Sequence, residues 1–77
     1  MNNVTKRETC LKLIYEFIKV NGPVDSDTIC YEVGKHYKHG IQASEMGRYL
    51  TELHGKGKID LIGQIGSKHS NVWAVKE

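Results

Sequence analysis

SEMGRYLTELHGKGKI, residues 44–59, is the segment that determines how the rest of the chain is interpreted. Its apolar residues Met46, Leu50 and Leu53 are spaced at i, i+4 and i+7, so they lie on one side of an α-helix. Glycine, which commonly ends helices, follows directly after this pattern. The segment therefore predicts a helix over about residues 42–54 that packs one side into a core.

The opposite side of this helix is polar. With about 100° between successive residues, it is centred on Ser44, Arg48 and Thr51. Arg48 has a planar guanidinium that suits the two acceptors of guanine in a DNA major groove, or a backbone phosphate. The alternative is a surface arginine paired with Glu45 or Glu52 at helical spacing. We expect the contact with DNA, which makes Arg48 the first candidate for a binding residue.

Two apolar runs follow this helix and predict a β-hairpin over about residues 58–76. The runs Ile59–Ile65 and Val72–Val75 are separated by a polar stretch that contains glycine and serine, which is typical of paired strands. Basic residues stand at the start and at the tip of the hairpin: Lys56, Lys58, Lys68 and His69.

Another helix is expected near the N-terminus. Thr5 and Glu8 form a capping box, in which each side chain satisfies a free backbone donor. The apolar residues that follow recur every three or four positions, until Gly22 and Pro23 end the helix.

A second helix follows at once. Asp25 is placed to cap it, and Val24 and Ile29 occupy the two positions of a hydrophobic staple. Either Gly34 or Gly40 can end this helix, and we expect the longer version.

The order helix, helix, helix, hairpin resembles the winged helix-turn-helix family of DNA-binding domains. The resemblance runs from Thr5 to Val75 and is strongest over residues 44–59, where Ser, an apolar residue, Arg and Leu lead to Leu and Gly before the first strand. The segment NGPVDSDTI, residues 21–29, is similar to the passage between the first two helices of the family. The resemblance implies one α+β domain over residues 1–77, with three helices followed by a two-stranded wing.

The same resemblance implies a function. In the family the third helix enters the major groove and the wing lies along the backbone or the minor groove. The chain is thus expected to bind double-stranded DNA sequence-specifically, as a small prokaryotic or phage regulator of transcription. The candidate DNA-binding residues are Lys38, His39, Gln42, Ser44, Arg48, Thr51, Lys56, Lys58, Lys68 and His69.

The distribution of charge agrees with an anionic partner. The net charge is +2, of which residues 1–34 contribute −1 and residues 35–77 contribute +3. All four histidines also lie in the second part. A basic half favours nucleic acid as the partner.

The sequence lacks the motifs of several other classes of protein. It has no Walker loop, paired-carboxylate arrangement or nucleophile elbow, so we expect no enzyme, no cofactor and no small-molecule substrate.

The sequence has no run of about 18 apolar residues, so we expect no membrane partner. The N-terminus lacks the apolar core of a secretory signal, which favours the cytoplasm. Cys10 and Cys30 are therefore expected to be reduced thiols, and their spacing does not match a zinc site.

Trp73 raises a different possibility. Z-DNA-binding domains resemble this architecture and use a tryptophan in the last strand of the wing. Those domains carry an Asn and a Tyr one turn apart on the third helix, where this chain has Gly47 and Thr51, and paired prolines in the wing, where it has none. We therefore expect Trp73 to pack over the first helix, with Val75 on the same face of its strand.

A winged helix can also bind protein rather than DNA, because a fold does not fix a function. Leu13, Tyr15 and Val20 fall outside the main apolar stripe of the first helix. They are candidates for a surface that binds a second copy of the chain or a host protein. The alternative function is thus a protein-interaction module that inhibits or binds a partner without binding DNA.

Overall fold

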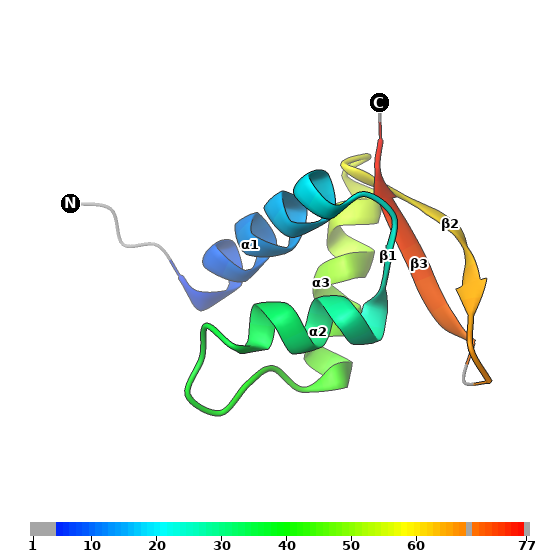
Figure 1. The fold of residues 1–77 in the computed structure, drawn as a ribbon. Coiled ribbons are helices and arrows are strands. Elements are labelled where there is room, and N and C mark those ends of the chain that lie inside the picture. Colours follow the sequence, from blue (N-terminus) through cyan, green and yellow to red (C-terminus); the bar gives the residue numbers. More distant parts are fainter. Residues whose placement is uncertain (1–4, 68, 77) are drawn as a thin grey trace.

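The computed structural model describes residues 5–67 and 69–76 (Figure 1). Within them the chain forms three helices, α1 (Lys6–Asn21), α2 (Ser26–Gly34) and α3 (Ala43–Gly55). It also forms three strands, β1 (Val24–Asp25), β2 (Ile59–Ile65) and β3 (Ser70–Val75), which make an antiparallel sheet in the order β1-β3-β2. The α+β winged-helix architecture predicted from the sequence is confirmed.

The sheet has one strand more than the expected two-stranded wing. Val24 pairs with Trp73 and Asp25 pairs with Val72, so β1 covers one edge of β3 (Figure 1). A strand of two residues carries no periodic pattern of its own. Its pairing partner is also distant in the sequence, so only the tertiary structure defines it.

α1 begins and ends as the sequence predicts. The Thr5 hydroxyl oxygen accepts a hydrogen bond from the Glu8 amide at 3.1 Å. The helix ends at Asn21, and Gly22 follows with a left-handed φ of 77°, a conformation that glycine adopts without a steric penalty. Its buried residues face α2, α3 and β3, so α1 covers one side of the core.

The expectation for the end of α2 is wrong, because this helix stops at Gly34. The chain then turns twice, with the Tyr37 amide donating to Gly34 and the Gly40 amide donating to Tyr37. A Cβ atom on Gly34 would lie 3.3 Å from the backbone nitrogen of Ile41. The returning chain therefore packs directly on the end of α2, and a longer helix would leave no room for this return.

One apolar cluster joins the three helices to the base of the wing. The sheet contributes Ile59 and Trp73, and the helices contribute most of the rest, including Ile14, Ile29 and Leu50. Trp73 is 6% exposed, which confirms that it belongs to the core.

The indole N–H of Trp73 donates to the Ser26 hydroxyl at 2.9 Å, and that hydroxyl donates to the Asn71 carbonyl at 3.2 Å. A buried polar edge of tryptophan needs such a partner. The chain of bonds fixes the wing to the start of α2.

Candidate nucleic-acid interface

α3 separates its apolar and polar residues onto two sides. Met46, Leu50 and Leu53 are buried, as their spacing predicts. Tyr49 is buried as well, at 8% exposure, although the sequence did not assign it to the core. Its position between Met46 and Leu50 in the apolar pattern was the signal that could have identified it.

The polar side of α3 faces solvent. Ser44, Arg48 and Thr51 are all exposed, and Gln42 is exposed at the N-cap position. The structure thus brings these four candidate residues onto one helix face or its start. The Thr51 hydroxyl donates its proton to the Gly47 carbonyl at 2.8 Å. In this conformation the hydroxyl oxygen can only accept a hydrogen bond from a ligand.

Arg48 does not form the ion pair that its spacing allows. In the part of the chain that the structure describes, no carboxylate lies within ion-pair distance of its guanidinium. Glu45 and Glu52, the neighbours at helical spacing, are both engaged elsewhere. Arg48 is therefore a solvent-facing cation that has no direct ion-pair partner among the described residues, although its charge still acts on nearby Glu45.

Glu45 is held on the side of α3 that faces α1. The Tyr49 hydroxyl donates to it at 2.5 Å, and the Lys6 ammonium lies 3.5 Å from the same carboxylate oxygen. The bond from Tyr49, with a smaller contribution from Lys6, lowers the pKa of Glu45. The same bond raises the pKa of Tyr49.

Glu52 is held in the same way about two turns further along α3. The Lys56 ammonium lies 3.1 Å from it, and the Arg7 guanidinium makes two hydrogen bonds to its two oxygens, one of them 3.0 Å long. The bonds from Lys56 and Arg7 lower the pKa of Glu52. A forked contact of this kind is stronger and more directional than a single one.

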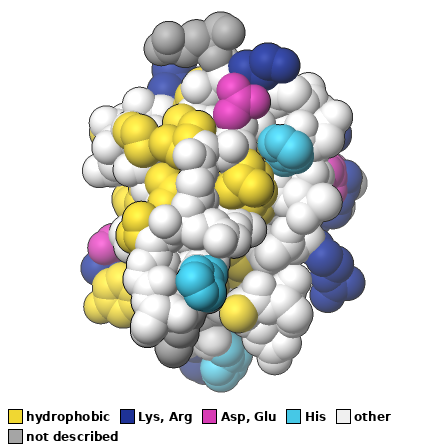
Figure 2. All heavy atoms as spheres, turned by 90° about the vertical axis from the view of Figure 1, so that its right-hand side faces the viewer, with side chains coloured by type: hydrophobic (Ala, Val, Ile, Leu, Met, Phe, Trp, Pro, Cys, Tyr) yellow, Lys and Arg dark blue, Asp and Glu magenta, His cyan; other side chains and the backbone are white. Residues whose placement is uncertain are grey.

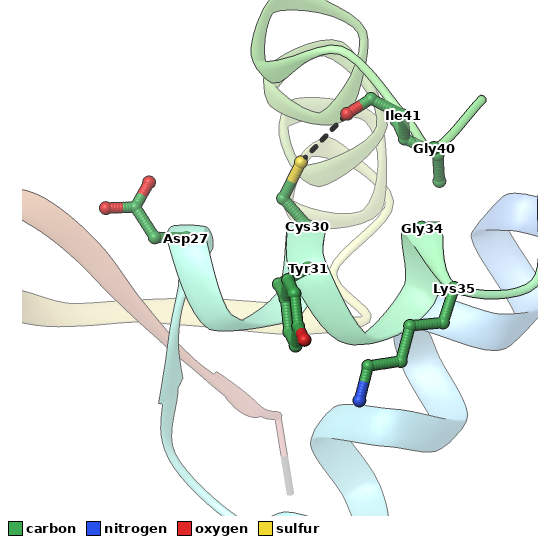
Figure 3. A pocket seen from close by; sticks show the side chains of 7 residues that line it. All are labelled: Asp27, Cys30, Tyr31, Gly34, Lys35, Gly40 and Ile41. Atoms are coloured by element: carbon green, nitrogen blue, oxygen red, sulfur yellow. Dashed lines mark hydrogen bonds between the residues drawn. The ribbon is translucent and has the colours of Figure 1, made fainter.

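The segment between α2 and α3 exposes Lys38 and His39, which precede α3 in the chain. Two thiols, one from α2 and one from α1, bond to this segment. The Cys30 thiol donates to the Ile41 carbonyl at 3.1 Å, as Figure 3 shows, and the Cys10 thiol donates to the Tyr37 hydroxyl at 3.2 Å. Burial, with the Cys10 contact, raises the pKa of Tyr37 to about 12, so this phenol stays protonated at neutral pH.

The basic residues near the wing do not share one location. Lys56 and Lys58 line a hollow of about 270 Å³ together with residues of α1 and α3, namely Leu11, Lys12, Tyr15 and Leu53. His69 is exposed at the far end of the wing, in a left-handed conformation with φ 55°. Lys68, the other candidate at the tip, lies outside the described residues.

The outer strand of the wing exposes apolar side chains that the sequence analysis did not single out. Leu61 is 46% exposed, and Ile62 and Ile65 are each 54% exposed. Figure 2, which faces the sheet side of the molecule, shows hydrophobic side chains across this face and Lys and Arg side chains mostly along its edges. A β-bulge between Leu61 and Gly63 interrupts the alternation of the strand.

His54 links the end of α3 to the wing. Its exposed ring packs edge-on against Trp73, with 5.7 Å between the ring centroids. Sequence reasoning did not assign His54 a role, because nothing local to it indicates the distant tryptophan. The contact joins the end of α3 to β3.

The thiols do not form a reactive or metal-binding centre in the described ranges. Cys10 is buried and Cys30 is half-buried, and both are free. Burial, with nearby Asp27 and Glu45, raises the pKa of Cys30, which favours the unreactive thiol. Residues 5–67 and 69–76 hold no cluster of three or more His, Cys, Asp or Glu suited to a metal. None of their helices has the length and apolar character to cross a membrane.

Comparison with known proteins gives a structural relative. No protein-family model matches the chain, and no curated protein matches it. A solved structure that is similar is the Zalpha domain of PKZ from Carassius auratus in complex with Z-DNA. It shares 21% sequence identity at a TM-score of 0.70, over 92% of this chain and 98% of that chain. At this identity the likeness shows the fold, which is a winged helix.

Proposed function

We propose that this chain is a double-stranded DNA-binding protein that acts as a small regulator of transcription. The observation that carries the proposal is Arg48, an exposed arginine on the open side of α3 that has no ion-pair partner among the described residues. Ser44 and Thr51 share its side of the helix, and Lys38, His39 and Gln42 precede it. α3 enters the major groove in this arrangement, and the wing lies on the backbone or the minor groove.

The fold of the Zalpha domain, which was solved with Z-DNA, supports a nucleic-acid partner. The side chains favour right-handed DNA for this chain. Trp73 is buried and its indole N–H is bonded to Ser26. The exposed side of α3 carries Gly47 and Thr51 rather than an aromatic residue. The domain therefore offers neither an exposed Trp73 ring nor an aromatic side chain at positions 47 and 51 to left-handed DNA.

The test begins with the isolation of preferred duplexes from a randomised B-form pool, followed by titrations at one fixed salt concentration. Arg48→Ala should cost roughly 1–3 kcal/mol of binding free energy on the preferred duplex and relax specificity at one position, if Arg48 reads a base. The unfolding free energy should change by no more than about 0.5 kcal/mol, because the side chain is exposed. A brominated CG duplex in the Z-form should bind no better than a scrambled B-form duplex.

Lys19→Ala is the matched control. It removes one exposed cation from α1, which is not part of the proposed interface. If Arg48→Ala and Lys19→Ala have equal effects on the selected duplex, Arg48 makes no special contact. Unchanged affinity in both variants would remove Arg48 from the interface altogether.

The second candidate function is a protein-interaction module, and the exposed apolar residues of β2 favour it. Of the three α1 residues expected to form a partner surface, only Val20 is exposed, at 79%, while Leu13 and Tyr15 pack partly against the core. Retention on a heparin column separates the two functions. A DNA-binding protein elutes late and its elution depends steeply on salt, whereas a protein-binding module has no such requirement.

A further inference from the structure

α3 contains two carboxylates that could pair with Arg48 and so compete with an anionic ligand for it. Glu45 stands three residues before Arg48, and Glu52 stands four residues after it. Oppositely charged residues at these spacings are neighbours on a helix surface and usually attract each other. Without other contacts, the helix would neutralise its own arginine.

The first turn of α1 supplies those other contacts. Lys6 lies 3.5 Å from Glu45, and Arg7 forms a forked pair with Glu52. Both cationic side chains are about half exposed, at 51% and 54%, whereas the two carboxylate side chains are only 25% and 23% exposed. The carboxylates are thus partly covered on the α1 side of α3.

Each carboxylate also has a partner from α3 itself. Tyr49 donates to Glu45, and Lys56 contacts Glu52. Tyr49 is buried, and its hydroxyl holds the Glu45 carboxylate beside the core. Both acids are therefore engaged by two groups each, and Arg48 is not among those groups.

We propose that the start of α1 positions Arg48 for its ligand by holding the two neighbouring carboxylates toward α1, beyond ion-pair distance of the Arg48 guanidinium. Lys6 and Arg7 are then positioning residues that do not touch DNA. This inference rests on the proposed function for its consequence on DNA binding, but its structural part concerns the free protein. When both cations are absent, Glu45 and Glu52 become able to pair with Arg48 and to repel phosphate.

The test compares two double variants with the same change of charge. Lys6→Gln/Arg7→Gln removes the positioning pair. Lys12→Gln/Lys19→Gln removes two other exposed cations of α1, neither of which has an ion-pair partner in the described residues. Adding Glu45→Gln/Glu52→Gln to each double variant removes the competing carboxylates. A melting curve for each variant confirms that it is folded.

The first measurement is a nitrogen–proton NMR spectrum of the guanidinium groups in the absence of DNA. The chain has two arginines, Arg7 and Arg48, so the spectrum of the Lys6→Gln/Arg7→Gln variant contains one arginine side chain. Its Nε–H signal should shift and exchange more slowly with water than the Arg48 signal of the wild type. The shift should disappear when Glu45 and Glu52 are also replaced. A signal that stays at its wild-type position overturns the inference, whatever the protein does with DNA.

The second measurement is affinity for the selected duplex. Because a surface pair within a helix is weak, Lys6→Gln/Arg7→Gln should bind about twofold to threefold more weakly than the charge-matched control. The carboxylate replacements should abolish this difference. A shifted guanidinium signal with identical affinity in both double variants would support the positioning role and count against Arg48 as a DNA contact. The failure of the inference and the failure of the proposed function thus give different results.

Discussion

α3 and the wing share the candidate residues, but the structure gives the two regions different surfaces. α3 buries Met46 and Leu50 and exposes a polar side that contains Arg48. β2 of the wing exposes Ile62 and Ile65 instead, and basic side chains lie mostly at the edges of that face (Figure 2). Charge and hydrogen-bonding groups that can read a base are thus concentrated on α3. The wing offers apolar surface along its length and basic residues at its ends.

The comparison also separates the base of the wing from its outer part. Trp73, at the base, is part of the core and is bonded to Ser26, whereas the side chains of Ile62 and Ile65 are more than half exposed. The base therefore contributes to the stability of the fold in the same way as the buried side of α3. The outer part leaves the side chains of Ile62 and Ile65 exposed, where a partner could contact them.

Trp73→Ala has the largest expected effect on this comparison. Removal of a buried tryptophan should lower the free energy of unfolding by about 3–5 kcal/mol, since it leaves a cavity and removes the indole N–H that donates to the Ser26 hydroxyl. Ile65→Ala, on the same hairpin but 54% exposed, should cost no more than about 0.5 kcal/mol. Urea denaturation followed by circular dichroism measures both. Equal costs in the two variants would mean that the hairpin is one unit without a distinct base.

A smaller effect is expected from acid, and on α3 it concerns the carboxylates of Glu45 and Glu52. The pKa values of Glu45 and Glu52 are held below the usual 4.5 by their hydrogen bonds to Tyr49 and Lys56 and by the cations of α1. A carboxyl with a lowered folded-state pKa contributes stability above its unfolded pKa, and this contribution is lost as the pH falls through the folded value. Stability should therefore decline below about pH 4.5.

Urea denaturation at a series of pH values from neutral to acid measures this decline. Glu45→Gln/Glu52→Gln should show a shallower dependence, with the remainder due to other carboxyls such as Asp25, whose pKa is also lowered by its bonds to Thr28. The same pH profile in the variant and the wild type would show that the contacts of Glu45 and Glu52 with Tyr49, Lys56 and α1 do not hold their pKa values down in solution.

The same contrast explains what the sequence could predict. The candidate side of α3 followed from periodicity, because a helix with one buried side must expose the opposite one. The outer face of β2 did not follow, because a strand alternates only around a regular ladder and this one contains a bulge after Leu61. The sequence also did not predict which contacts keep Glu45 and Glu52 from pairing with Arg48. They include contacts from Lys6 and Arg7, which are remote in the sequence and become neighbours only when α1 packs on α3.

The end of α2 shows a second kind of limit. Both Gly34 and Gly40 could stop the helix on local grounds, and the choice was wrong because it ignored the return of the chain. The close approach of Ile41 to Gly34 is a tertiary contact that no local signal records. The first helix, by contrast, was predicted to its last residue because a cap at Thr5 and a left-handed glycine at Gly22 are local features.

The smallest expected effect belongs to the tip of the wing. Lys68→Ala should weaken binding to every duplex by a similar factor, because a contact to phosphate carries no base information. The slope of log affinity against log salt concentration should fall by about one unit. Lys76→Ala, which removes an exposed lysine just beyond β3, is the charge-matched control and should change the slope less. Titrations of the selected and a scrambled duplex at several salt concentrations measure both quantities.

If Lys68→Ala instead altered the preference between the two duplexes, the tip would be reading bases in the minor groove. The wing would then share the role assigned to α3, and the contrast between the two regions would no longer hold.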